Sequence, residues 1–211
     1  MVYNDLLELP LKHYKIIYAD PPWFYADKSY SHGGGAEAHY PCMRTDSICN
    51  LPVKDVAADD SILFLWVTYP QLKEGISVVE SWGFDYKTVA FTWIKLTQAS
   101  IPAMGMGRYT RSNPEILLLG RRGKGAQRLR KDIMNVQFHK RLAHSQKPDL
   151  FRRLIVNLFG DLPRIELFAR EQTNGWDAWG NEILREYQLE MEIIDTPYKG
   201  RWPVSGRKGD D

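Results

Sequence analysis

The sequence predicts an α/β fold built on a mainly parallel sheet within a single domain. Short apolar segments with strand character alternate along the chain with amphipathic helical patterns, as in βαβ units. The length of 211 residues suits one domain, and the composition, 44% hydrophobic and 26% charged, is that of a globular protein. In such sheets ligands bind beyond the carboxyl ends of the strands, so residues that directly follow a strand are the first candidates for a site.

The first predicted strand is the apolar segment Lys15–Ala19, which ends at the Asp-Pro-Pro sequence after it. Tyr25–Pro41 is polar and contains three consecutive glycines, which disfavour regular structure, so we expect a loop. Thr45–Asn50 is predicted to form a short helix that Thr45 or Asp46 caps. The apolar run Ser61–Val67 is predicted to be a second buried strand.

The middle of the chain continues this alternation. Gln71–Trp82 has apolar residues at helical spacing, and Gly83 is predicted to end the helix. Tyr86–Lys95 alternates as a strand does, and Glu115–Leu119 is a further apolar strand. The segment between them, Leu96–Asn113, has no periodicity, and loops of that length in compact domains are usually functional.

The remaining elements follow a basic stretch that runs to Gln146 and has no predicted secondary structure. Pro148 opens an amphipathic helix that Gly160 closes. Arg164–Phe168 is predicted to be a strand, and Asp177–Tyr187 a helix. We expect the domain to span residues 1–195, with a loose Gly- and Pro-rich tail over 196–211.

Several classes of protein are excluded by short observations. The longest uncharged apolar run, Ser61–Pro70, has about half of the roughly 20 residues that a membrane helix needs. The N-terminal segment lacks the basic start of a signal peptide. The two cysteines, Cys42 and Cys49, are too far apart for a CxxC pair. We therefore expect a reduced, cytoplasmic protein that does not enter a membrane.

The charge is unevenly distributed. Residues 121–153 contain eleven basic and two acidic residues, so this segment carries +9 and the rest of the chain −7, for a total of +2. A basic segment on a mildly acidic body is typical of a protein that binds a polyanion. The alternative is a solvated loop followed by a helix whose outer face carries Lys and Arg.

The tetrapeptide Asp20-Pro21-Pro22-Trp23 directly follows the first predicted strand. Two prolines make it rigid and remove two N–H donors, which leaves the Asp20 carboxylate and the Pro21 carbonyl as acceptors. Such a site suits an exocyclic amino group, because both N–H groups are bound while the nitrogen lone pair points at an electrophile. Trp23 is predicted to offer a stacking surface for an extruded base. The alternative is a turn that merely ends a strand.

Four segments of this chain together resemble the MT-A family of adenine methyltransferases (the seventy-kilodalton-subunit type). The catalytic segment precedes the cofactor segment, as in the permuted subclass. The segments are Tyr18–Trp23 (YADPPW), His144–Pro148 (HSQKP), Arg164–Arg170 (RIELFAR) and Gly175–Glu182 (GWDAWGNE).

The resemblance implies a Rossmann-like methyltransferase domain that uses S-adenosylmethionine. The residues that it assigns to catalysis are Asp20, Pro21, Pro22 and Trp23. The residues that it assigns to the cofactor are Asp20, Lys147, Glu166, Phe168, Arg170, Asn174, Asn181 and Glu182. Lys147 would bind the methionine carboxylate near a helix N-terminus. Burying the Glu166 carboxylate without a partner costs free energy, so Glu166 would pair with Lys147 or Arg170. Where the family has a ribose-binding His-Asn pair, this chain has Gln172 and Thr173.

The same resemblance implies an adenine target, and we favour DNA over RNA because the chain is compact. An RNA adenosine methyltransferase and a non-catalytic nucleic-acid-binding scaffold stay open. The predicted nucleic-acid contacts are Tyr25, Arg108, Arg111, Arg121, Arg122, Lys124 and Arg128. No metal is expected, since His139 and His144 lack a third ligand. The expected setting is the cytoplasm of a prokaryotic or phage-infected cell, and the sequence does not decide between a monomer and a homodimer.

Overall fold

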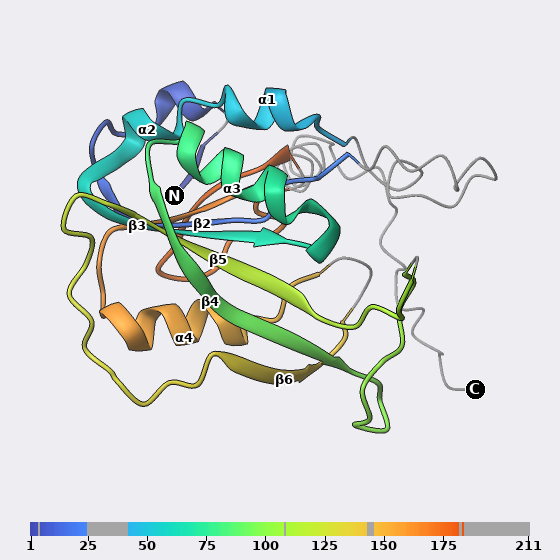
Figure 1. Cartoon of the computed structure of the whole chain (residues 1–211). Coiled ribbons are helices and arrows are strands. Elements are labelled where there is room, and N and C mark those ends of the chain that lie inside the picture. The colour runs from blue at the N-terminus through green and yellow to red at the C-terminus, as the bar shows by residue number, and fades with distance from the viewer. Residues whose placement is uncertain (4, 25–41, 108, 143–145, 182, 184–211) are drawn as a thin grey trace, which may run out of the picture.

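The computed structural model describes residues 1–3, 5–24, 42–107, 109–142, 146–181 and 183, which form one eight-stranded sheet with helices on both faces (Figure 1). The strands are β1 (Val2–Tyr3), β2 (Tyr14–Ala19), β3 (Ala57–Val67), β4 (Asp85–Leu96), β5 (Glu115–Arg122), β6 (Val136–Lys140), β7 (Arg164–Leu167) and β8 (Asp177–Trp179). The helices are α1 (Thr45–Cys49), α2 (Val53–Val56), α3 (Leu72–Ser81) and α4 (Leu150–Phe159), with 3-10 turns η1 (Leu6–Glu8) and η4 (Tyr69–Gln71).

The sheet is mainly parallel, which confirms the predicted fold class. Its strand order is β1-β8-β7-β2-β3-β5-β4-β6. All neighbouring strands are parallel except at β5, which is antiparallel to both β3 and β4. Because β5 runs the other way, its first residue lies at the edge of the sheet where β2, β3 and β7 end. We call this edge the carboxyl edge and the opposite one the far edge.

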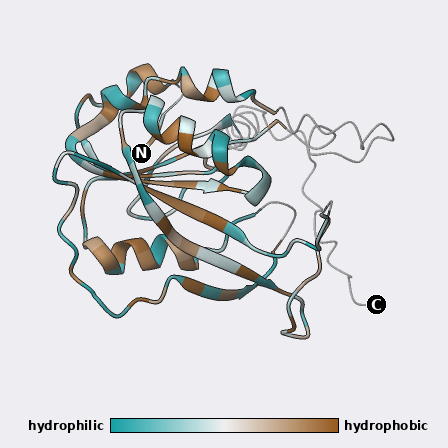
Figure 2. Ribbon diagram, in the orientation of Figure 1, coloured by the Kyte–Doolittle hydropathy of each residue, from teal (hydrophilic) through white to brown (hydrophobic). Residues whose placement is uncertain are grey.

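The two faces of the sheet have separate cores, because successive strand residues point to opposite faces. On one face Leu63 and Leu65 pack with residues of α1, α2 and α3. On the other, Phe64 and Trp66 pack against α4, whose Phe151 ring lies edge-on to Trp66 at 4.8 Å. Figure 2 shows helices with both hydrophobic and hydrophilic residues, as expected of helices that cover a sheet.

Three strands, β1, β6 and β8, differ from the sequence predictions, which have no strand at Val2–Tyr3. The sequence predicts that Asp177–Trp179 begins a helix, but it forms β8 between β7 and β1. Its central residue, Ala178, is buried, and a three-residue strand is too short to show a periodic pattern. The sequence pattern also does not predict the edge strand β6. Apolar and polar residues alternate along this short strand, but Val136 and Phe138 are the exposed ones, so the alternation does not mark an apolar face turned to the core.

A buried ion pair joins α4 to the sheet. Arg152 donates from Nε and Nη2 to the two oxygens of Glu166 on β7, at 2.7 and 2.8 Å. Both residues are buried, and the Arg152 guanidinium also lies 5.8 Å from the centre of the Tyr18 ring. The bidentate geometry compensates both charges for the loss of water. Glu166 is therefore paired with Arg152, and the predicted pairing with Lys147 or Arg170 is wrong.

Replacing Arg152 with Met should destabilise the fold by about 3–5 kcal/mol, because it leaves the Glu166 carboxylate buried without a partner. Urea unfolding measures the change in the free energy of unfolding. Arg153→Met is the matched control, because this neighbouring side chain is 69% exposed and pairs with the exposed Asp149. The control should cost less than about 1 kcal/mol. Equal losses in the two variants would contradict a structural role for the buried pair.

Candidate active site

The Asp-Pro-Pro-Trp turn begins where β2 ends, at the carboxyl edge, as predicted. The backbone N–H of Asp20 lies 3.4 Å from the Leu167 carbonyl oxygen, which ties the turn to the end of β7. The Pro21 carbonyl accepts a hydrogen bond from the Trp23 N–H at 2.9 Å, and the Pro22 carbonyl accepts one from Met43 at 2.7 Å. The turn is therefore rigid, and the Pro21 oxygen, expected to face a substrate, already has one donor.

The Trp23 side chain contradicts the predicted stacking surface. It is 6% exposed and belongs to the core beneath α1, α2 and α3. Its indole N–H donates to the Trp66 carbonyl at 3.0 Å. A buried Trp with a satisfied N–H is a packing residue. Its contribution is to fix the turn that carries Asp20.

An ion pair across the carboxyl edge joins Asp20 to Lys147, which precedes α4. Lys147 Nζ is 2.8 Å from Asp20 Oδ2, with side-chain exposures of 8% and 22%. Burial raises the pKa of Asp20, and the Lys147 ammonium offsets only part of that effect. Burial alone would lower the pKa of Lys147, but the charges of Asp20 and Glu115 outweigh it and raise that pKa. Asp20 thus has a hydrogen-bond donor, the Lys147 ammonium, beside it. This differs from the prediction that the turn presents acceptors only.

Glu115 is a site residue that the sequence analysis did not single out. It is the first residue of β5, and its Oε2 lies 3.3 Å from Lys147 Nζ. Its Oε1 accepts a hydrogen bond from Lys95 on β4. Burial would raise its pKa, but Lys147 and Lys95 together lower it. The sequence shows a carboxylate at the start of an otherwise apolar strand, PEILLL, but the first residue of a parallel strand would lie at the far edge, so only the antiparallel direction of β5 brings Glu115 to the site.

A hollow of about 470 Å³ opens beside this cluster. Glu115 and Lys95 form part of its wall, with Trp93, Arg141 and the methionines of the 97–114 loop. The loop is anchored by Asn113, which accepts a hydrogen bond from the Lys95 N–H at 3.0 Å and donates to the Lys95 carbonyl at 2.9 Å. Apolar side chains with a few fixed polar groups suit a planar heterocycle. The prediction that this loop is functional remains a prediction.

The residues expected to bind the cofactor gather only in part. Phe168 directly follows β7 with a left-handed backbone (φ 61°), and its ring lies 5.2 Å from Trp179. A Cβ on Gly180 would collide with the Ala169 backbone, so a glycine lets β8 end close against this turn. Arg170 is half-buried and close enough to lower the pKa of Asp20. Asn174 and Asn181 are exposed, and Glu182 lies outside the described residues.

The predicted nucleic-acid contacts do not form one surface. Arg121 and Arg122 pair with Ile62 and Ser61, at the far edge of the sheet, and Lys124 and Arg128 follow them. Arg122 donates to the Lys54 carbonyl at 2.6 Å. Arg111 is exposed in the loop at the carboxyl edge, whereas Tyr25 and Arg108 lie outside the described residues. Residues 121–128, which are predicted to contact nucleic acid, therefore lie away from the catalytic turn.

Other exposed cations do lie at the carboxyl edge. Lys140 ends β6, which is parallel to β4 and pairs with Leu96 there, and Arg141 follows it. Both belong to the basic segment, and no pattern in the sequence separates them from Arg121 or Arg128. The separation comes from β5 and β6, which run in opposite directions and so divide one basic segment between two edges.

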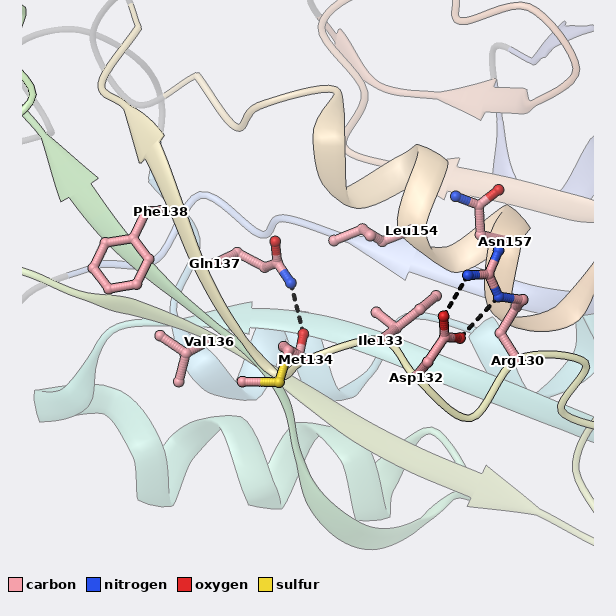
Figure 3. Close-up of a pocket in the computed structure, with 9 residues that line it drawn as sticks. All are labelled: Arg130, Asp132, Ile133, Met134, Val136, Gln137, Phe138, Leu154 and Asn157. Atoms are coloured by element: carbon pink, nitrogen blue, oxygen red, sulfur yellow. Dashed lines mark hydrogen bonds and ion pairs between the residues drawn. The ribbon is translucent and has the colours of Figure 1, made fainter.

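A second hollow, of about 510 Å³, lies between β6 and α4 (Figure 3). Arg130 and Asp132 form an ion pair at one side of it, and Gln137 donates to the Met134 carbonyl. None of its lining residues belongs to the Asp20 cluster. Within the described part of the chain, no helix is long and apolar enough to cross a membrane, and no three His, Cys, Asp or Glu side chains gather as metal ligands.

The chain is similar to one family of known proteins along most of its length. The profile of the MT-A70 family matches residues 14–182. The Type II methyltransferase M.MunI of Mycoplasma sp is 40% identical over 197 residues, which cover 83% of this chain and 80% of that protein. Human N(6)-adenine-specific methyltransferase METTL4 is 29% identical, and the N6-methyladenosine RNA methyltransferase MTA1 of Pyricularia oryzae is 28% identical. This chain spans 40% and 50% of the length of these two relatives.

The matched region contains the Asp20 turn, Lys147, Glu115 and the strand β7 with the segment that follows it. The family match therefore covers every element that builds the carboxyl-edge site, and the similarity to M.MunI extends along most of both proteins. The chain belongs to the MT-A70 family of adenine N6-methyltransferases.

Proposed function

We propose that this chain transfers a methyl group from S-adenosylmethionine to the exocyclic amino nitrogen of adenine in DNA. The observation that carries the proposal is the half-buried Asp20 carboxylate at the end of β2, fixed by Lys147 at 2.8 Å. A hollow of about 470 Å³, whose wall includes Glu115, lies next to this pair. Asp20 does not itself line the hollow but is joined to the lining residue Glu115 through Lys147, and we infer that an amino group bound at this edge reaches the Asp20 carboxylate.

The cofactor supplies a methyl group on a sulfonium sulfur, and the transfer forms an N–C bond as the S–C bond breaks. Positive charge then moves onto the amino nitrogen, which afterwards loses a proton. The Asp20 carboxylate accepts a hydrogen bond from this amino group and stabilises the developing charge, an interaction that is strongest in the transition state. The rigid Pro21-Pro22 turn keeps Asp20 in place, so little reorganisation is needed during the reaction.

The residues after β7 fit a cofactor of this kind. The left-handed backbone of Phe168 and the close approach of Gly180 make a tight turn at the carboxyl edge, next to Asp20. Arg170 supplies a cation there for the cofactor's carboxylate or hydroxyl groups, since Lys147 is engaged by two carboxylates. Strained backbone at the end of a strand is a frequent feature of ligand sites.

DNA is favoured over RNA by the extent of the similarities. M.MunI, a Type II methyltransferase, matches along 80% of its own length, and we infer a DNA substrate from this similarity. The RNA methyltransferase MTA1 matches along 50% of its length, so it has parts with no counterpart in this alignment. Incubating the chain and a labelled donor with DNA and, separately, with RNA of the same sequence shows which of the two is methylated.

We place the activity in the cytoplasm of a prokaryotic or phage-infected cell.

Replacing Asp20 with Asn should lower kcat at least about 100-fold, because the amide presents a donor and carries no charge to stabilise the amino group. Lys147 keeps Glu115 as a counter-ion, so the fold should persist. A radiolabelled methyl-transfer assay on adenine-containing DNA measures the loss, and circular dichroism checks folding. Asp59→Asn, at the far edge and exposed, should retain full activity. Full activity of the Asp20 variant would refute the proposal.

The rate should fall in acid because only the ionised form of Asp20 stabilises the positive charge that develops on the amino nitrogen. Burial raises the pKa of Asp20, so its carboxylate is lost at a higher pH than an exposed Asp would show. The kcat profile should therefore have an acidic limb above pH 3.8, the ordinary Asp value. Rapid methyl-transfer assays in short acid pulses measure it, and a rate that stays constant down to that pH would contradict the assignment.

Charge removal at the two edges should affect DNA binding differently. A triple variant Arg111→Gln, Lys140→Gln, Arg141→Gln should weaken binding and reduce the slope of log K against log salt by about 0.9 for each phosphate that the variant no longer neutralises. The matched variant Arg121→Gln, Lys124→Gln, Arg128→Gln removes the same charge at the far edge and should bind as the wild type does. Fluorescence anisotropy across a salt series measures both, and the reverse ranking would place DNA at the far edge.

A further inference from the structure

The Lys147 ammonium lies between two carboxylates, of which only Asp20 belongs to the catalytic turn. Lys147 Nζ is 2.8 Å from Asp20 Oδ2 and 3.3 Å from Glu115 Oε2. Lys95 in turn donates to the other oxygen of Glu115. These four side chains, from β2, β4, β5 and the segment before α4, form a connected series of alternating charges that sum to zero.

The second carboxylate changes what Lys147 does to the first. A buried ammonium with one carboxylate would engage it as strongly as geometry permits, since attraction between charges is large where water is excluded. Here Glu115 competes for the same ammonium from the start of β5. Lys95 holds Glu115 in turn, so its carboxylate is fixed by two partners and remains charged. Glu115 also forms part of the wall of the 470 Å³ hollow, beside the proposed substrate.

We infer that Glu115 is a positioning residue for methyl transfer. It takes up part of the hydrogen bonding and electrostatic attraction of Lys147 that would otherwise go to Asp20. The Asp20 carboxylate is therefore left able to accept hydrogen bonds from the substrate amino group. This role rests on the proposed function of Asp20. Glu115 acts through Lys147 and is not assigned a contact with the reacting atoms.

The charged groups that face Asp20 come from each neighbouring element. They are Lys147 before α4, Glu115 on β5, Arg170 after β7 and Glu166 on β7, and the neutral, titratable Tyr18 lies on β2. Burial has the largest effect on the pKa of Asp20 and raises it. Among the neighbouring charges, Lys147 and Arg170 lower this pKa and Glu115 raises it. Removing the charge of Glu115 therefore lowers this pKa, whereas removing the charge of Lys95 leaves the negative charge of Glu115 less compensated and raises it.

These opposite signs define the experiment. Glu115→Gln should lower kcat about tenfold or more and move the acidic limb of the kcat profile to lower pH. Lys95→Met should move that limb to higher pH. The double variant restores neutrality around Asp20 and Lys147, so its acidic limb should return toward that of the wild type. Its kcat should stay as low as that of Glu115→Gln, because Glu115 no longer competes with Asp20 for Lys147. A salt bridge with only a structural role would give no shift of the limb in either single variant, and a kcat restored in the double variant would contradict the positioning role.

Asp85→Asn is the matched control, because it removes one carboxylate charge from β4 at the far edge, where Asp85 pairs with Arg121 in the sheet. It should leave kcat and the acidic limb unchanged. Carbon-13 NMR titration of the Asp20 carboxyl group in the wild type and in Glu115→Gln gives a readout that needs no activity. The Asp20 signal should titrate at lower pH in the variant.

The outcomes separate the two proposals. An active wild type with an unchanged limb and an unchanged Asp20 titration in Glu115→Gln overturns the positioning role alone. A wild type that does not methylate adenine overturns the proposed function and with it the catalytic meaning of Glu115, whatever the titration shows. If Glu115→Gln does not fold, Lys95→Met still tests the inference, and a limb that does not move to higher pH overturns it.

Discussion

The need to bury an ammonium together with two carboxylates constrains this structure more than any other interaction. Lys147, Asp20 and Glu115 come from three segments that are distant in sequence: the loop before α4, the end of β2 and the start of β5. A buried charge is tolerated only when a partner of opposite charge is present. Each of these charges gains a partner where the three segments meet at the carboxyl edge, and their meeting assembles the site.

A second buried ion pair supports the same edge from the other side of β2. Arg152 and Glu166 join α4 to β7, and Tyr18 on β2 lies between this pair and the Asp20 cluster. The Tyr18 hydroxyl accepts a hydrogen bond from the Trp66 indole at 2.7 Å. The end of β2, directly before Asp20, is thus held by contacts with the strands on both sides of β2. A carboxylate with so little freedom has its orientation set before any substrate arrives.

The fold class and the place of Asp20 are predictable from the sequence because both depend on local signals. Lys15–Ala19 is apolar and ends at two prolines, so the strand and its end are visible without any partner. The unpredicted features depend on pairing between distant segments. Glu115 joins the site only because β5 is antiparallel, and Trp23 is buried only because the 42–49 segment and α3 close over it. The division of the basic segment between two edges likewise follows from strand direction, which composition does not encode.

The sheet ends in a strand that nothing covers within the described part of the chain. β6 pairs with β4 on one side, and on that strand Phe138 is 62% exposed and Val136 is exposed as well. The six residues Ile133–Phe138 contain no charge and no proline, the features with which proteins usually keep strand edges from joining. We therefore expect concentrated solutions of this protein to associate edge to edge, and Val136→Lys to reduce that association.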